Sequence, residues 1–486
     1  MAHEELLKPT LHIEALLKFP PPGPGVNLEI CTALAVRLKD DYDTVTVGQR
    51  VTGFDGLKHH KLLGGVEIAD YTGPENKTGY YDLRHVELDV QAYVLVTEDD
   101  TDPSRTIEQG EADDLPKARI LQLPNAALNE EWSSLVFDDA LPARLLRYLV
   151  RMLSMMSQPG LNLSTFNWNR LCLLHGPPGS GKSTLCRALA QKLSIRLGNI
   201  FTKSILVEIN TNAMLSKYFG ESGKLIGAMF ERIYSLAQNR STLVCVVMDE
   251  VETIAGSRTR STNGSECNDG LRATNQLLTA LDRLRNLPNI IVICTSNLID
   301  AIDSAFLDRV DIKQLIPTPS PAAIYNIFRS CINELVRSSL VDSTTTNPTT
   351  PVHAAPPSTP PKPTTRANKN KRKLDQTDPP SSSSRTTLIP SSSSANDSWS
   401  LVAQPQTIPP FSEMKVKYEN QPSSPAHRVW TLAQRCHGLS GRTLRRLPIL
   451  GLAMYTWGGI CSLEEAVSAL EKAVEQELLV VGRGVV

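Results

Sequence analysis

The chain has 486 residues, which is enough for about three domains with cores of their own. It carries 50 Lys and Arg against 51 Asp and Glu, and this balance argues against a protein that holds DNA or RNA through a broad basic surface. The nine cysteines are scattered, with no CxxC pair and no zinc-knuckle spacing, so buried reduced thiols are expected rather than a metal or redox module. No secretory signal pattern opens the chain and no apolar run is long enough to span a bilayer, so we expect a soluble intracellular protein.

The first 125 residues mix strand-like stretches with Gly/Pro turns. The clearest strand is expected at residues 86–96, and an acidic tract follows at residues 98–114. Nothing in this region has catalytic spacing. We therefore expect residues 1–125 to form a separate α+β domain that offers a surface to a substrate or adaptor.

From residue 126 to residue 318 the pattern predicts an α/β unit. Apolar positions recur at helical spacing between Asp138 and Gln158, and short apolar strands then alternate with helices from Leu171 to about Ile316. This alternation is typical of a parallel sheet covered by helices.

A phosphate-binding loop follows the strand that begins at Leu171. The sequence GPPGSGKST leads into the helical run LCRALAQKL, which is the GxxxxGK[ST] motif in its strand-to-helix context. Glycines let backbone N–H groups turn toward phosphate, and the helix N-terminus adds positive potential. The predicted ATP-binding residues are Gly176, Pro177, Pro178, Gly179, Ser180, Gly181, Lys182, Ser183 and Thr184, with Lys182 reaching the β/γ oxygens and Ser183 binding Mg²⁺.

Two carboxylates complete the predicted hydrolytic site. The apolar run LVCVVM predicts a buried strand, and Asp249 and Glu250 emerge where open parallel sheets bind ligands. Asp249 is predicted to be the second Mg²⁺ ligand and Glu250 the base that activates water. Glu252 is expected to be a structural or surface residue rather than a catalytic one. A third strand, residues 290–294, ends in Thr-Ser-Asn, and Asn297 is predicted to hold the attacking water or to sense the γ-phosphate.

Residues 341–427 are rich in Pro, Ser and Thr and are predicted to be a disordered insertion. A basic cluster at residues 369–373 within it suits either a nuclear import signal or an ordinary solvated charge run. Helical patterning resumes near Val429. Residues 319–340 and 428–486 therefore flank the insertion.

In their order and spacing, GPPGSGKS, VVMDE, TSN and AFLDR resemble the AAA+ ATPases. A closer resemblance is to the pachytene checkpoint protein 2 family, also described as the thyroid receptor-interacting AAA+ ATPases. It rests on WNR at 168–170, LCRALAQKLSIRL at 185–197, SKYFGESGK at 216–224, DRVDIKQ at 308–314 and GLSGRTLRRLP at 438–448. The resemblance implies a P-loop AAA+ module in which residues 319–340 and 428–486 are a small helical lid split by the insertion.

The resemblance also implies a homohexameric ring that uses ATP and Mg²⁺ to pull on HORMA-domain proteins, with or without an adaptor. Such activity serves meiotic recombination and checkpoint control, which places the protein in the nucleus on chromosomes, with a cytoplasmic pool as an alternative. Tyr218 and Phe219 fall on the family's pore-loop positions, although the family often has Trp in place of Tyr218. A buried helix-edge aromatic pair is the alternative reading. The loop at residues 256–269 fits a second pore loop or a solvated loop.

Two arginines match further family positions. Arg309 corresponds to the finger that reaches the γ-phosphate of a neighbouring subunit, and a salt bridge within the subunit is the alternative. Arg442 corresponds to the lid sensor, with Ser440 and Gly441 starting its helix. Arg445 and Arg446 are expected to be surface or inter-subunit charges.

Four other functions are compatible with part of the sequence. A DNA-handling AAA+ machine conflicts with the neutral charge and the missing DNA-binding motif. A nucleotide-gated scaffold, or a remodeller of a different substrate, remains the alternative to HORMA remodelling. A small-molecule kinase would leave the TSN and SGR motifs unexplained.

Overall fold

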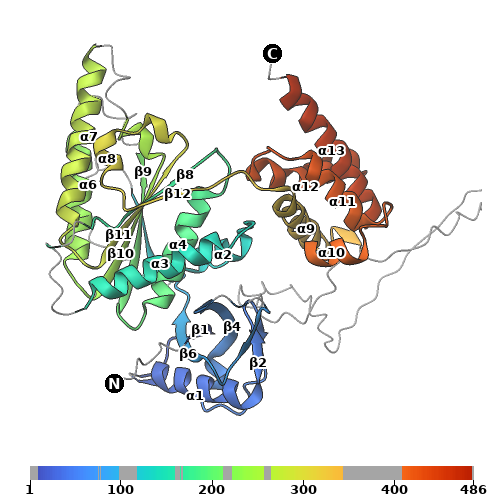
Figure 1. Cartoon of the computed structure of the whole chain (residues 1–486), viewed down its shortest axis with the longest axis horizontal. Coiled ribbons are helices and arrows are strands. Elements are labelled where there is room, and N and C mark those ends of the chain that lie inside the picture. The colour runs from blue at the N-terminus through green and yellow to red at the C-terminus, as the bar shows by residue number, and fades with distance from the viewer. Residues whose placement is uncertain are drawn as a thin grey trace, which may run out of the picture.

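The computed structural model describes residues 9–23, 25–74, 76, 78–97, 118–158, 165, 168–211, 222–256, 264–342 and 408–483. They form three bodies (Figure 1): an N-terminal domain, a large subdomain built on a parallel sheet, and a small helical subdomain. The N-terminal domain lies below the large subdomain and the helical subdomain lies to one side of it. The AAA+ architecture predicted from the sequence is confirmed.

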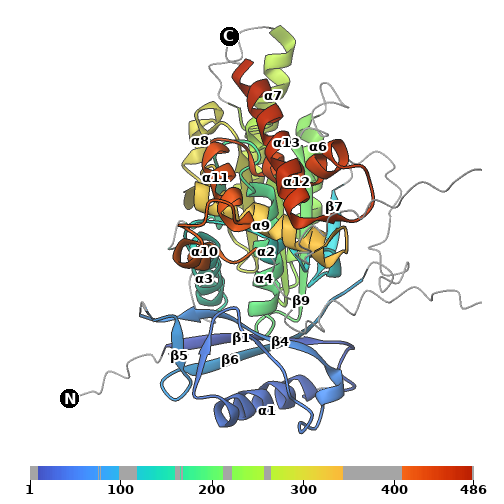
Figure 2. The ribbon, with the colours of Figure 1, turned by 90° about the vertical axis from the view of Figure 1, so that its right-hand side faces the viewer.

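The N-terminal domain is a four-stranded sheet, in the order β3-β4-β1-β6, with one long helix against it. Its elements are β1 (Thr10–Leu17), α1 (Val26–Asp41), β2 (Thr44–Thr46), β3 (Arg50–Val51), β4 (Leu63–Thr72), β5 (Tyr80–Asp82) and β6 (Glu87–Val94). Strand β1 pairs antiparallel with β4 and parallel with β6. Helix α1 covers the face of the sheet that is turned away from the large subdomain (Figure 2), where Leu34 and Leu38 share a core with Ile13. The expected α+β domain is present, and β6 is the strand predicted at 86–96.

The large subdomain contains a six-stranded sheet in the order β12-β8-β11-β10-β9-β7. Its strands are β7 (Arg119–Leu123), β8 (Leu171–His175), β9 (Lys203–Asn210), β10 (Thr242–Asp249), β11 (Ile290–Ser296) and β12 (Ile312–Leu315). All neighbours from β12 to β9 are parallel, as the alternation predicted. The carboxyl ends of these strands therefore lie along one edge of the sheet.

Strand β7 corrects the predicted domain boundary at residue 125. It pairs antiparallel with β9 at the edge of the large sheet, so residues 119–123 belong to the large subdomain. Its inward side chains, Leu121 and Leu123, are buried in the large subdomain's core. A five-residue strand with three apolar side chains carries too weak a pattern to be assigned to one sheet or another from sequence.

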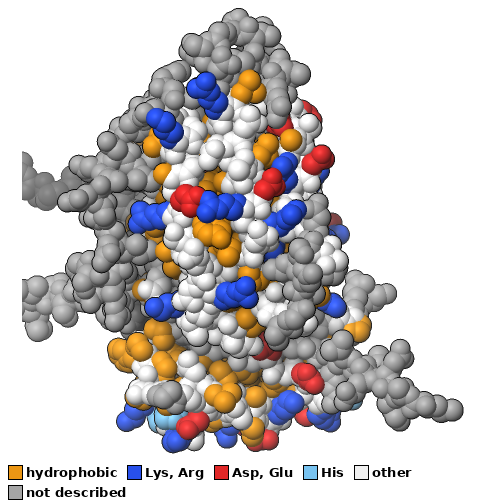
Figure 3. Space-filling model, turned by 90° about the vertical axis from the view of Figure 1, so that its left-hand side faces the viewer, with side chains coloured by type: hydrophobic (Ala, Val, Ile, Leu, Met, Phe, Trp, Pro, Cys, Tyr) orange, Lys and Arg blue, Asp and Glu red, His pale blue; other side chains and the backbone are white. Residues whose placement is uncertain are grey.

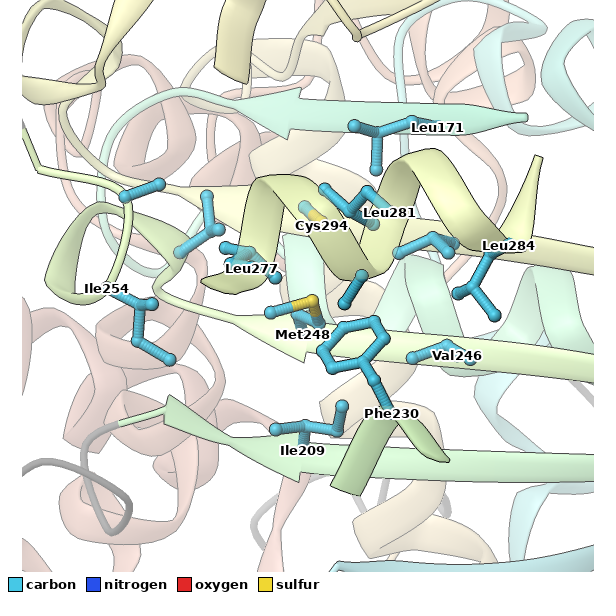
Figure 4. Close-up of a cluster of buried hydrophobic side chains, with 14 of the residues drawn as sticks. Leu171, Ile209, Phe230, Val246, Met248, Ile254, Leu277, Leu281, Leu284 and Cys294 are labelled. Atoms are coloured by element: carbon cyan, nitrogen blue, oxygen red, sulfur yellow. The ribbon is translucent and has the colours of Figure 1, made fainter. Parts of the chain in front are cut away.

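Helices cover both faces of this sheet because its central strands are apolar on both sides. Along β10, Val244, Val246 and Met248 enter one core, while Leu243, Cys245 and Val247 enter the other. The helices are α2 (Glu131–Ser134), α3 (Leu141–Met156), α4 (Lys182–Arg196), α6 (Ser222–Ala237), α7 (Gly264–Leu284) and α8 (Ser304–Leu307). Helices α3 and α4 close one core, and α6 and α7 close the other, in which Phe230 lies beside Met248 and Val246 (Figure 4).

The small subdomain joins chain from both sides of the predicted insertion. It comprises α9 (Pro321–Arg337), β13 (Val341–Asp342), α10 (Phe411–Lys417), α11 (Pro425–Arg435), α12 (Gly441–Tyr455), β14 (Cys461–Ser462) and α13 (Leu463–Arg483). The helices share one core, and β13 pairs with β14. This is the split lid that the family resemblance implied.

The insertion is shorter than the predicted span of 341–427. Residues 341–342 form β13, and residues from 408 onward fold against the lid. Ile408 is completely buried, and the Phe411 ring lies 4.7 Å from that of Trp430. Burial of these apolar side chains stabilises the segment against the lid. The Pro/Ser/Thr-rich sequence around them hides this from an analysis of composition. Residues 343–407, with the basic cluster at 369–373, lie outside the described residues.

The N-terminal domain meets the large subdomain at the far end of α4. Glu14 of β1 is 4% exposed and binds two cations of α4: the Lys192 ammonium at 2.5 Å and the Arg196 guanidinium at 3.4 Å. Burial alone would raise the pKa of Glu14, but the two cations outweigh it and lower that pKa. Gln191, on the same helix, exchanges two hydrogen bonds of 2.9 Å with the backbone of Asn125, which follows β7 in the large subdomain. The ion pairs of Glu14 with Lys192 and Arg196 are therefore the polar contacts of α4 that join the two domains.

The surface carries no single charged stripe on the face shown in Figure 3, where basic and acidic side chains alternate and hydrophobic ones gather toward the N-terminal domain. Among the described residues, no helix combines the length and apolarity needed to cross a membrane. The described cysteines are free thiols, as their scatter predicted.

Candidate active site

The loop between β8 and α4 has the backbone that the glycine-rich motif predicts. Gly176, Gly179 and Gly181 have φ values of 146°, 72° and 94°, which side chains disfavour. A Cβ on Gly176 would lie 2.2 Å from the Ile316 carbonyl oxygen, so no other residue fits there. The Lys182 ammonium donates to the carbonyl oxygens of Gly176, at 2.9 Å, and Pro177, at 2.8 Å.

The loop is therefore a preformed anion cradle. Burial lowers the pKa of Lys182, and the nearby Asp249 carboxylate partly offsets this shift. Helix α4 begins at Lys182 and points its N-terminus into the same space. Ser180 and Thr184 also line the cavity at this point, together with Pro178.

Asp249 lies where the ends of β8, β10 and β11 meet. The Ser183 hydroxyl donates to its carboxylate at 2.8 and 3.0 Å, and the Thr295 hydroxyl donates to the same group. Thr295 also accepts a 3.1 Å bond from the backbone N–H of Glu250. The hydroxyl of Ser183 and the carboxylate of Asp249 are hard oxygen ligands of the kind that Mg²⁺ prefers. The Ser183 hydroxyl and the Asp249 carboxylate therefore lie close together, as the sequence predicted.

Glu250 directly follows β10 and adopts a left-handed backbone, with φ 55° and ψ 51°. A non-glycine residue in this region stores strain of order 1–3 kcal/mol, which surrounding structure must hold. The Thr211 hydroxyl helps to fix this strained backbone by donating to the carbonyl oxygens of Asp249, at 2.5 Å, and Glu250, at 3.2 Å. Glu250 is among the residues that line the cavity.

Asn297 lines the same cavity directly after β11, and its role toward the attacking water or the γ-phosphate stays a prediction. Its backbone N–H donates to Glu252 at 2.9 Å, so Glu252 fixes the position of this turn, in agreement with the structural role expected for it. Sequence reasoning missed the roles of Thr295 and Thr211. The available signal was that both are polar residues at the carboxyl ends of strands adjacent to β10.

The lid closes directly over the phosphate loop. Ser440 caps α12 by accepting from the Thr443 N–H at 3.2 Å, and the N–H of Gly441 donates to the Gly179 carbonyl at 2.9 Å. A Cβ on Gly179 would lie 2.7 Å from that of Ser440, which shows how closely the two segments pack. Arg442 follows in the first turn and lines the cavity, and its role as a lid sensor stays a prediction. The cavity holds about 1070 Å³, an ample volume for a nucleotide.

Arg309 does not line this cavity. Its guanidinium forms a two-point ion pair with the Asp282 carboxylate at 2.8 and 2.9 Å, and donates to the Ala305 carbonyl at 2.7 Å. The side chain is 27% exposed, so the pair lies at the surface of the subunit. The contact is the within-subunit salt bridge that the sequence left open. The predicted pore-loop residues Tyr218 and Phe219 lie outside the described residues, as do residues 257–263 of the loop that fits a second pore loop or a solvated loop.

Comparison with known proteins agrees with this geometry. The family of ATPases associated with various cellular activities (AAA) matches residues 172–318, the TRIP13 N-terminal domain matches residues 6–98, and the TRIP13-like AAA+ ATPase lid C-terminal domain matches residues 384–478. Pachytene checkpoint protein 2 homolog of Danio rerio is 36% identical over 336 residues, which cover 69% of this chain and 76% of the relative. The chain belongs to the pachytene checkpoint protein 2 family of AAA+ ATPases.

Other relatives extend the match. Pachytene checkpoint protein 2 homolog of Homo sapiens is 40% identical over 252 residues, covering 52% of this chain and 58% of the relative. The solved structure of C. elegans PCH-2 shares the fold with a TM-score of 0.64 at 24% identity, and the match covers 96% of this chain and 99% of that one. Membership of the pachytene checkpoint protein 2 family makes the chain an ATP-binding ATPase, as predicted. The match to the lid family begins before residue 408, in agreement with α10 being part of the lid.

Proposed function

We propose that this ATPase is a homohexameric remodeller that uses ATP hydrolysis to pull HORMA-domain proteins through a central pore. The observation that carries the proposal is the separation of Arg309 from its own subunit's site: the cavity contains Arg442 from the lid, while Arg309 stands at the subunit surface, paired with Asp282. A surface arginine beyond the P-loop cavity is placed to serve a neighbouring copy's site. Turnover then requires assembly.

Within one site, each residue has a separate task. Lys182 and the loop N–H groups bind the β- and γ-phosphates, and Arg442 brings the lid onto the γ-phosphate. Mg²⁺, when bound, neutralises charge on the phosphate oxygens, and Ser183 and Asp249 are the residues that would hold it. Glu250 accepts a proton from the attacking water, and Asn297 orients that water. The strained backbone of Glu250 is held by Thr211, which keeps the base fixed before substrate arrives.

The substrate class follows the family. The curated relatives carry the name pachytene checkpoint protein 2 homolog, which supports action in meiotic prophase and therefore on chromosomes in the nucleus. HORMA-domain proteins are the substrates that the resemblance implies, with Tyr218 and Phe219 gripping an extended segment of them in the pore. The N-terminal domain, whose outer face includes exposed Leu28 and Val36 on α1, is the proposed docking surface for the substrate or its adaptor.

The test is ATP turnover by the wild-type protein and by Glu250→Gln, each with and without a folded HORMA-domain protein. Glu334→Gln serves as the control because Glu334 is an exposed lid residue paired with Arg337. Wild-type and control turnover stimulated by the HORMA protein, with none from Glu250→Gln, would support both the motor and its substrate class. Turnover without stimulation would leave a remodeller of another substrate. No turnover under conditions that assemble the ring would indicate a nucleotide-gated scaffold.

A further inference from the structure

The wall of the nucleotide cavity includes a short connecting segment that no sequence motif marks. Residues 134–139 run from the end of α2 to the start of α3, and every one of them lines the cavity. This segment is separate from both the phosphate loop and the acidic strand β10. Together with the segment 314–319, which also lines the cavity, it is a wall available to the part of the nucleotide that lies beyond the phosphates.

The lid holds this segment at three points. The Arg445 guanidinium, on α12, donates to the carbonyl oxygen of Ser134. Val136 packs against the hydrophobic core of the lid. At the other end, the Ser320 hydroxyl donates to the carboxylate of Asp138, whose second oxygen accepts from the Ser320 N–H at 3.3 Å. Ser320 is the N-cap of α9, so both lid helices that face the cavity are tied to the segment.

Arg445 and Arg442 line different parts of the cavity. They are three residues apart on α12 and therefore project from the same side of the helix, about 4.5 Å apart along its axis. Both line the cavity. Arg442 belongs to the turn that touches the phosphate loop through Gly441, whereas Arg445 is bonded to the connecting segment. The sequence predicts a surface or inter-subunit charge at Arg445, and the structure has this residue exposed, at the rim of the cavity that it helps to line.

We propose that Arg445 is a positioning residue for nucleotide binding: by holding Ser134 it closes the lid on residues 134–139 and fixes the wall that receives the nucleoside. Arg445 acts through the backbone of the segment, so its loss weakens binding of the nucleoside part and leaves the hydrolytic groups in place. The inference concerns the ATP site alone and does not depend on the substrate proposed above.

The experiment compares Arg445→Ala with Arg446→Ala. Arg446 is the adjacent residue on α12 but pairs with Glu477 at 3.4 Å and does not line the cavity. Steady-state turnover is measured against ATP concentration, and the inhibition constants of ADP and of inorganic pyrophosphate are measured by displacement of a fluorescent nucleotide. Loss of one charged hydrogen bond at a partly exposed position is expected to raise KM and the ADP constant about five- to tenfold. The value of kcat and the pyrophosphate constant should stay within about twofold of the wild type, as should all four values for Arg446→Ala.

Two outcomes would overturn the inference. Equal weakening of ADP and pyrophosphate by Arg445→Ala would place the arginine on the phosphates instead. Unchanged KM with a lowered kcat would make it part of the hydrolytic machinery or of the subunit interface. Arg445→Lys distinguishes a lost hydrogen bond from a disturbed lid: it keeps a donor on a long stem and should recover part of the ADP affinity, whereas lid misfolding would show as a lowered unfolding temperature in both variants.

Discussion

Replacing Glu14 by Gln removes one buried negative charge and leaves the cations of Lys192 and Arg196 without their anionic partner. The Glu14 and Arg196 side chains are each 4% exposed and that of Lys192 is 14% exposed, so water cannot replace the lost partner. Breaking a buried ion pair from one side typically costs about 3–5 kcal/mol. At about 1.4 kcal/mol for each factor of ten, the docking equilibrium between the N-terminal domain and α4 should weaken by about two to three and a half orders of magnitude.

Hydrogen exchange measures this equilibrium locally. In Glu14→Gln, amides in β1 and in the last two turns of α4 should lose protection by that factor, while amides in β10 and β11 should change little. Glu29→Gln is the matched control, because Glu29 is a glutamate of the same domain whose partner Lys58, at 2.9 Å, lies on the exposed surface. The control should exchange like the wild type.

The pH dependence gives the sign of the effect. Because the folded-state pKa of Glu14 is lowered, its contribution is present above the unfolded value of about 4.3 and is lost as the pH falls through the folded pKa. The difference between wild type and Glu14→Gln should therefore be constant from about pH 5 to 8 and shrink below about pH 4. Adding Lys192→Met and Arg196→Met to Glu14→Gln should restore most of the protection. Unchanged exchange in Glu14→Gln at neutral pH would refute the reasoning, because it would mean that this interface is open in solution.

Three further predictions concern the motor. Lys182→Ala should reduce ATP affinity by more than about a hundredfold, since a charged donor to phosphate is lost, and near-normal binding in a titration would contradict the cradle described above. Arg309→Ala and Glu250→Gln should each be inactive alone, but mixing them should restore turnover, because a subunit with Glu250 can receive Arg309 from its neighbour; mixtures that stay inactive would place Arg309 within its own subunit, paired with Asp282. Tyr218→Ala should keep ATP turnover within about twofold yet lose conversion of a HORMA-domain substrate, and conversion at the wild-type rate would exclude a pore-loop role.

Sequence patterns were sufficient wherever a motif constrains backbone and chemistry together. The glycines around Lys182 require the φ values that were found, and the apolar strand before Asp249 placed that carboxylate beside Ser183. Patterns were insufficient where contacts depend on tertiary packing. Neither the burial of Glu14 against α4 nor the contact of Arg445 with Ser134 has a local signature, because each pair is separated by more than a hundred residues along the chain.

Composition was misleading in two places. Residues 408–417 share the Pro/Ser/Thr-rich surroundings of the insertion, yet Ile408 and Met414 bury enough apolar surface to fold against the lid. Arg170, which composition rules would place at the surface, is 2% exposed and donates to the carbonyl oxygens of Leu284 and Arg285. Burial lowers its pKa to about 10, so the guanidinium remains charged at neutral pH.

The two chain ends that border residues 343–407 are both anchored in the lid. On one side β13 is paired with β14, and on the other the N–H and carbonyl of Ile408 bond to the side chain of Asn333, at 3.0 and 3.1 Å. Lid assembly therefore relies on packing between helices rather than on continuity of the chain. A protease cut placed between residues 343 and 407 should leave a two-fragment enzyme that stays together and still turns over ATP. The same site should accept a fluorescent protein or an affinity module, which would report lid movement during the ATPase cycle from outside the nucleotide cavity.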